Sequence, residues 1–272
     1  MTVTKQSSAP GNPSPINSDQ VLTLLAASES PWRNVTVVAS TGSTNADLVQ
    51  VITAGGAEEG TIIAADQQTA GRGRLGRDWQ SPAGSSLSFS VLLRPPMQHS
   101  GFVPALAGVA IAAAIGDVGG PPVSLKWPND VMVSDLKAAG ILAEAASGMV
   151  VLGCGINVTM TPDQLPVPTA TALNLHGVTL DRSKLLAACI SRLAQLNERW
   201  REAGYDPQAS GLLDEYRMLC ATIGSEVVVS LPDGNSLTGF VEAVDRFGQL
   251  QLRTDDGRRT LSAGDVVHVR PE

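Results

Sequence analysis

Three arginines alternate with glycines in residues 71–77, whose sequence is GRGRLGR and which we call the arginine loop. Glycine lets the backbone come close to a ligand, and a guanidinium group can hold a carboxylate or a phosphate with two parallel hydrogen bonds. The loop therefore predicts a site for a ligand that carries both kinds of anion. A solvated basic turn is the alternative.

The arginine loop also matches the G-x-G-x-x-G fingerprint of dinucleotide-binding folds. That fingerprint must open a helix whose N-terminus faces the pyrophosphate. Residues 78–84 (DWQSPAG) instead have the composition of a loop. We therefore do not interpret this segment as a Rossmann turn.

Further motifs follow downstream: KWPND at residues 126–130, KAAGILAE at 137–144 and GCGIN at 153–157. In this order, and together with the arginine loop and Trp79, they resemble the catalytic domain of biotin protein ligases. The resemblance covers roughly residues 32–174, and the small C-terminal region resembles the last domain of that family. Ala138 stands where family sequences usually carry leucine, a departure that concerns local packing only.

The resemblance implies an α+β fold, in which a mixed-sheet catalytic domain of the biotin/lipoate ligase type precedes a small C-terminal β-barrel. It also implies a ligase that uses ATP and Mg²⁺ to convert biotin to biotinyl-5'-AMP. The biotin then passes to a lysine of the biotin carboxyl carrier domain of a biotin-dependent carboxylase. A lipoate ligase or an octanoyl transferase of the same fold is the alternative, although those families usually lack the arginine loop joined to KWPND.

The resemblance places short polar residues at 43–45 against the ureido ring of biotin, which needs donors and acceptors at fixed angles. Capping of a helix by Ser43 or Thr44 is the alternative role, and both roles can coexist. Glycines at 153 and 155 would let the backbone approach the ligand beside an apolar wall at Ile156. The residues assigned to biotin are Ser43, Thr44, Asn45, Gln68, Arg72, Gly73, Arg74, Lys137, Gly140, Gly153, Gly155 and Ile156.

Lys137 is the residue expected to act in the chemical step. The biotin carboxylate must approach the α-phosphate of ATP, and two anions about 4 Å apart at an effective dielectric constant of ~20 repel by ~4 kcal/mol. A lysine between them would remove that penalty in the transition state. The resemblance places Lys137 there, with Arg72 and Arg74 folded over the adenylate. A surface lysine is the alternative.

The resemblance also implies a nucleotide site, in which Trp79 offers a flat face to adenine. Asp130, the carboxylate of the KWPND motif, could hold Mg²⁺. The alternative role of Asp130 is to cap the turn after Pro128. We interpret Trp127 as a packing residue and Cys154 as a small apolar residue, because no histidine is near Cys154 in the sequence to activate it. The residues assigned to the nucleotide are Arg74, Arg77, Trp79, Lys126, Asn129 and Asn157.

Apolar periodicity indicates the elements that must position these residues. A capping-box-like pair, Thr44 and Asp47, predicts the start of a helix that ends at Gly55. We divide the chain into a mobile tail (1–30), a catalytic domain (31–221) and the barrel domain (222–272), with regular structure beginning near Val21 or Trp32. Strands are predicted at 35–39, 61–65, 87–93, 226–231, 238–244, 249–253 and 266–269, and helices at 104–115 and 183–203.

Composition restricts the class of protein. The 19 basic and 26 acidic residues give a net charge of -7, which argues against a chain that mainly coats nucleic acid or a membrane. Three cysteines without paired spacing indicate neither a disulfide framework nor a zinc site. We expect a cytoplasmic enzyme, either a monomer or a ligand-dependent homodimer. The segment before Trp32 is short and poor in basic residues, so no repressor role is expected.

Overall fold

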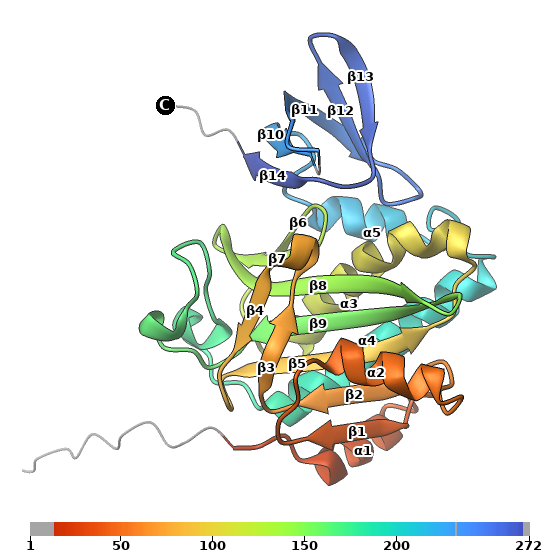
Figure 1. Cartoon of the computed structure of the whole chain (residues 1–272), viewed down its shortest axis with the longest axis vertical. Coiled ribbons are helices and arrows are strands. Elements are labelled where there is room, and N and C mark those ends of the chain that lie inside the picture. Colours follow the sequence, from red (N-terminus) through yellow and green to blue (C-terminus); the bar gives the residue numbers. More distant parts are fainter. Residues whose placement is uncertain (1–13, 232, 269–272) are drawn as a thin grey trace, which may run out of the picture.

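The computed structural model describes residues 14–231 and 233–268. A seven-stranded sheet with helices on both faces makes up most of the chain, and a smaller sheet lies at one end (Figure 1). The α+β fold predicted from the sequence is confirmed.

The large sheet is mixed, because its first two strands run parallel and all other neighbours are antiparallel. Both faces of the interior strand β5 are covered, so all eight of its residues are buried, including the serines that alternate with its apolar residues. The strands in spatial order are β1 (Val35–Val38), β2 (Ile62–Ala65), β5 (Ser86–Leu93), β9 (Met149–Asn157), β8 (Leu136–Ala146), β7 (Asp130–Val133) and β6 (Ser124–Lys126).

One face of the sheet carries α3 and α4, and the opposite face carries α2 (Figure 1). The apolar residues of α3 and α4 join the main core, whereas Leu48 and Ile52 of α2 form a second cluster with Ile63, Leu92 and Val151. The helices are α1 (Ser18–Ala27), α2 (Thr44–Thr53), α3 (Val103–Asp117), α4 (Arg182–Glu202) and α5 (Leu212–Leu219), with short 3-10 turns at Arg74–Gly76, Met97–Phe102, Pro162–Gln164 and Leu173–His176.

The run Met97–Asp117, which includes α3, is the one described helix whose length and composition would allow it to cross a membrane. Of its most apolar window, 67% is buried inside the protein. The core helix of a globular protein passes the same test of length and composition. The prediction that residues 104–115 form a buried helix is confirmed.

Helix α1 corrects the prediction of a mobile tail over residues 1–30. Asn17 caps this helix by accepting a hydrogen bond from the Gln20 backbone amide. Val21 and Leu25, four residues apart, are fully buried where α1 packs against α4. The prediction is wrong for this helix because two well-placed apolar residues repay its ordering. Residues 1–13 of the predicted tail lie outside the described residues.

Two local predictions also need correction, one at the start of α2 and one after the arginine loop. Ser43, rather than Thr44, is the N-cap of α2, and its side chain makes no capping hydrogen bond. Asp47 instead accepts a hydrogen bond of 2.6 Å from the Thr41 hydroxyl.

Residues 78–81, expected to be loop, form strand β4 (Asp78–Ser81), which pairs with β3 (Gln68–Arg72). The arginine loop is therefore the tip of a β-hairpin.

The small C-terminal sheet has the antiparallel order β13-β12-β11-β10-β14. Strand β13 was not predicted because its residues are almost all exposed and show no apolar alternation. Hydrogen bonds between the described residues leave β13 and β14 as two edges, so they do not close the predicted barrel. The strands are β10 (Glu226–Ser230), β11 (Ser236–Val244), β12 (Leu250–Thr254), β13 (Gly257–Leu261) and β14 (Asp265–His268).

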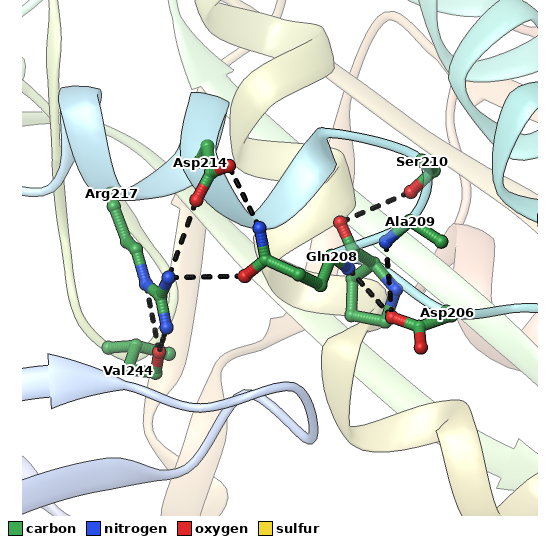
Figure 2. Close-up of polar contacts among 8 residues, drawn as sticks. Asp206, Gln208, Ala209, Ser210, Asp214, Arg217 and Val244 are labelled. Atoms are coloured by element: carbon green, nitrogen blue, oxygen red, sulfur yellow. Dashed lines mark hydrogen bonds and ion pairs between the residues drawn. The ribbon is translucent and has the colours of Figure 1, made fainter.

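Two sets of hydrogen bonds fix this sheet to the catalytic domain. The buried Trp127 donates from its indole to the Gly248 carbonyl at 2.9 Å and from its backbone to the Thr222 hydroxyl at 3.0 Å. Figure 2 shows the second set, in which Arg217 of α5 donates twice to the Val244 carbonyl at the end of β11. The prediction that Trp127 is a packing residue is confirmed.

Candidate active site

One cavity of about 890 Å³ lies between the large sheet, the β3–β4 hairpin and strand β14. Every predicted site residue except Ile156 lines it, so segments from residue 43 to residue 157 meet at one place. The structure contradicts Ile156 as a wall residue, because its fully buried side chain belongs to the main core. The neighbouring residues of β9, Gly153, Cys154, Gly155 and Asn157, line the cavity.

Polar side chains form a hydrogen-bond network at one end of the cavity, which we call the ring-end network. Both the backbone amide and the hydroxyl of Thr44 donate to Gln68 Oε1, at 2.9 and 3.1 Å. Asn45 donates from Nδ2 to Glu144 Oε2 at 2.6 Å. The Ser90 hydroxyl, fully buried on β5, lies between Thr44 and Asn45. These contacts give residues 44 and 45 a role beyond helix capping.

Glycines form the floor of the cavity. Side chains from other segments lie so close to these glycines that a Cβ atom would overlap or crowd them. A Cβ atom at Gly153 would overlap the Asn45 amide, and one at Gly155 would overlap the Trp79 indole. At Gly140 a Cβ would lie 3.1 Å from the Trp79 ring and 3.2 Å from Lys137 Nζ. Trp79 therefore lies against the sheet, where it walls the middle of the cavity.

The β7–β8 hairpin brings the predicted catalytic lysine to the predicted metal ligand. Lys137 Nζ lies 2.6 Å from Asp130 Oδ1 and 5.7 Å from the centre of the Trp79 ring. Both side chains are partly exposed to the cavity, at 33% for Lys137 and 22% for Asp130. The Lys137 backbone is held as well, because its amide donates to Thr169 O and its carbonyl accepts from Thr171 N. This lysine is a lining residue of the cavity rather than a solvated surface lysine.

Two side chains of the arginine loop reach the C-terminal sheet. Arg77 forms a 2.9 Å ion pair with Asp265, and Arg74 donates to the Gly264 carbonyl at 3.3 Å and to Asn129 Oδ1 at 3.4 Å. Burial lowers the pKa of the Arg74 guanidinium from its ordinary value. The loop is therefore not a solvated turn at Arg74, whereas the side chain of Arg77 is 61% exposed.

The remaining predicted nucleotide residues also line the cavity, and two of them have side chains that hydrogen-bond to the backbone. The Asn129 and Asn157 amides donate to backbone carbonyls, at Ile141 (2.7 Å) and Thr171 (2.9 Å), so they also fix the shape of the site. Lys126 lines the cavity from β6, and Arg72 from the exposed edge of β3. Their predicted contacts with the nucleotide stay predictions.

Sequence reasoning missed parts of the site. Asp265, Val266 and His268 line the cavity from β14, and Val167, Thr169 and Ala170 line it from a loop after β9. No local pattern marks these residues. Ser90 could have been found, because serines alternate with apolar residues at 86, 88 and 90 on an otherwise apolar strand.

The cysteines and acidic clusters support no other chemistry in the described part of the chain. All three cysteines are buried, and desolvation raises the pKa of the Cys154 thiol well above its ordinary value. A thiol held protonated is a poor nucleophile, in agreement with its prediction as a small apolar residue. Within residues 14–231 and 233–268, no group of three or more His, Cys, Asp or Glu side chains could hold a metal ion.

Comparison with known proteins identifies the class. The model of the biotin/lipoate A/B protein ligase family matches residues 37–160, and that of the biotin protein ligase C terminal domain matches residues 222–269. The fold agrees, since the structure of the Aquifex aeolicus biotin protein ligase in complex with biotin and ATP superimposes with a TM-score of 0.74. That match has 27% identity and covers 88% of this chain and all of that one.

Two relatives narrow the class. The biotin–acetyl-CoA-carboxylase ligase of Mycobacterium tuberculosis is 39% identical over 264 residues, which are 94% of this chain and 97% of that protein. The bifunctional ligase/repressor BirA of Bacillus subtilis is 31% identical, over 77% of this chain and 66% of that protein. The chain belongs to the biotin protein ligase family.

Proposed function

We infer that this protein is an ATP-dependent biotin protein ligase. It activates biotin to biotinyl-5'-AMP and transfers the biotin to a lysine of an acceptor protein. The proposal rests on one observation: residues of the ring-end network, Lys137 and the arginine loop line the same cavity. A lipoate ligase or octanoyl transferase is not favoured, because the C-terminal sheet matches the domain model of biotin ligases.

In the first step a carboxylate oxygen of biotin attacks the α-phosphate of ATP, and pyrophosphate leaves. The ring-end network binds the ureido ring, so the valerate chain extends over the glycine floor toward Lys137. The lysine cation lies between the two reacting anions and stabilises the charge that builds up in the transition state. Arg72 and Arg74 bind the phosphate and carboxylate oxygens from the opposite side.

Mg²⁺ takes hard oxygen ligands, and Asp130 is the carboxylate beside Lys137 that fits it. When bound, the ion would neutralise phosphate charge. Asp130 pairs with Lys137 in this structure, so its carboxylate would be shared between the lysine and the ion.

In the second step the neutral amine of the acceptor lysine attacks the carbonyl carbon of the mixed anhydride. AMP leaves, and an amide bond forms without a covalent enzyme intermediate. We propose the biotin carboxyl carrier domain of an acyl-CoA carboxylase as the acceptor, in the cytoplasm. The protein would act as a monomer or as a dimer that forms when ligand binds.

Mass spectrometry of the purified protein incubated with biotin, ATP and Mg²⁺ tests the proposal, with lipoate and octanoate as competitors. Biotinyl-5'-AMP should form and pyrophosphate should be released, even when both competitors are in excess. Formation of lipoyl or octanoyl adenylate instead would contradict the assignment.

A further inference from the structure

We propose that Glu144, on β8, is a positioning residue that sets the orientation of the Asn45 side-chain amide and thereby the recognition of the ligand's ring. This inference rests on the proposed function, because it assumes that the ring-end network binds biotin. Glu144 is the last residue of the KAAGILAE motif.

The orientation of Asn45 follows from the chemistry of its two neighbours. A carboxylate can only accept hydrogen bonds, so Asn45 must turn Nδ2 toward Glu144 Oε2, which lies 2.6 Å away. Its Oδ1 then faces the Ser90 hydroxyl, which donates at 2.5 Å. Without Glu144, an asparagine amide could present either end to Ser90, because a hydroxyl both donates and accepts.

Packing fixes the position of Asn45 but not its orientation. Asn45 is 6% exposed, and its amide covers Gly153, where a Cβ atom would overlap it. The two ends of an amide have nearly the same size and shape, so close packing alone cannot distinguish them. The charged partner is therefore the group that selects the orientation in which Oδ1 accepts from Ser90 and lies over Gly153, at the edge of the cavity.

The Ser90 hydroxyl connects Asn45 to the rest of the network, because it also lies 2.7 Å from the Thr44 hydroxyl oxygen. The Thr44 hydroxyl and backbone amide both donate to Gln68 Oε1, so Gln68 is left with its Nε2 to offer a ligand. The network presents an acceptor at Asn45 and a donor at Gln68, which matches a ureido ring with its N–H groups and carbonyl oxygen. The ring of lipoate has neither group.

The substitution Glu144→Gln tests this role because the new amide has the same size but can both donate and accept. The dissociation constant of biotin, measured by equilibrium titration, should rise between about twofold, if the two amide orientations become equally populated, and about tenfold, if the flipped orientation is preferred. The KM for ATP and kcat at saturating biotin should stay at parent values, since neither depends on the ring. Glu226→Gln, an exposed carboxylate on β10, is the matched control and should change nothing.

A reciprocal exchange separates orientation from a merely structural role. Asn45→Asp alone places two carboxylates side by side and should weaken biotin binding more than Glu144→Gln does. In the double variant, the new amide at position 144 can donate to the new carboxylate at position 45, whose other oxygen still accepts from Ser90. Biotin affinity should therefore return to within about threefold of the parent value, as expected when two coupled residues are exchanged together.

Three results would overturn the proposal: parent affinity in Glu144→Gln, equal losses in biotin and ATP binding, or a double variant no better than its single variants. None of these bears on the proposed function, which fails only if the parent protein makes no biotinyl adenylate.

Discussion

Lys137 and Asp130 form an ion pair that gives the catalytic assignment a geometric basis. The register of the β7–β8 hairpin pairs Lys137 with Met132, two residues along β7 from Asp130, so the lysine side chain can reach the acid. Backbone hydrogen bonds to residues 169 and 171 hold the lysine from the other side. Such a fixed cation can stabilise a transition state without a large reorganisation of its surroundings.

We expect Lys137→Ala to slow adenylate formation by roughly 10²–10³-fold, the usual loss when one fixed transition-state donor is removed. The fold should survive, because the side chain is partly exposed. Pyrophosphate release is the measurement, with Lys184→Ala on the surface of α4 as the control. Release at nearly the parent rate from Lys137→Ala would show that this lysine is not catalytic.

We expect Arg74 mainly to keep biotinyl-5'-AMP bound in the cavity. The substitution Arg74→Gly removes the contacts with Asn129 and Gly264, while glycine leaves the backbone of the arginine loop free to move. Biotinyl-5'-AMP should still form, then escape and label bystander proteins such as serum albumin. Streptavidin blotting of albumin measures the leak, and Lys137→Ala in the same assay should label nothing. If Arg74→Gly makes no adenylate, Arg74 acts in the first step instead.

Among the secondary-structure elements, the β3–β4 hairpin and strand β14 together close one side of the cavity. The hairpin tip contains two adjacent residues with positive φ, Leu75 at 57° and Gly76 at 73°. The ion pair from Arg77 to Asp265 ties this tip to β14. Because both charges are partly exposed, the pair contributes only about 0.2–1 kcal/mol.

Asp265→Asn should therefore loosen the arginine loop without unfolding the protein. Trypsin cleavage within the loop should accelerate up to about fivefold, which corresponds to about 1 kcal/mol, while the melting temperature stays nearly unchanged. Asp255→Asn, in an exposed turn of the same sheet, is the control. The difference in cleavage rate between variant and parent should shrink at high salt, because salt already screens the exposed ion pair in the parent. Equal cleavage rates of variant and parent at low salt would show that the Arg77–Asp265 ion pair does not hold the loop.

For the molecule as a whole, charge and architecture bear on its partners. The chain carries a net charge of -7, and the described arginines nearest the ligand site face the cavity or the C-terminal sheet. The chain aligns with 66% of the length of the Bacillus subtilis ligase/repressor. Nonspecific and specific binding to DNA both depend strongly on a cationic surface.

We expect this 272-residue chain to form no sequence-specific complex with DNA, with or without biotin and ATP. A gel-shift assay at physiological salt is the measurement, with unrelated DNA in excess as the competitor. A specific complex that survives the competitor would support a repressor function.

The sequence by itself determined the motifs, the helices α2, α3 and α4, the strands β1, β2 and β5, four strands of the C-terminal sheet and about half of the residues that line the cavity. Local patterns suffice here, because apolar periodicity and turn residues act over a few positions. The same patterns did not predict α1, α5, β13 or the strands β3, β4 and β6 to β9. Strand β13 is almost entirely exposed and shows no apolar alternation, and glycines interrupt the apolar alternation of β8 and β9.

Only the tertiary structure decided which groups face one another. Ile156 was assigned to the site, yet its side chain packs into the main core. Asp265 lies 188 positions from Arg77 in the sequence, and Glu144 lies 99 positions from Asn45. Such pairs depend on strand register and on the docking of the C-terminal sheet, and both result from many weak contacts between distant parts of the chain. No short segment contains that information, so these partners could be found only in the folded molecule.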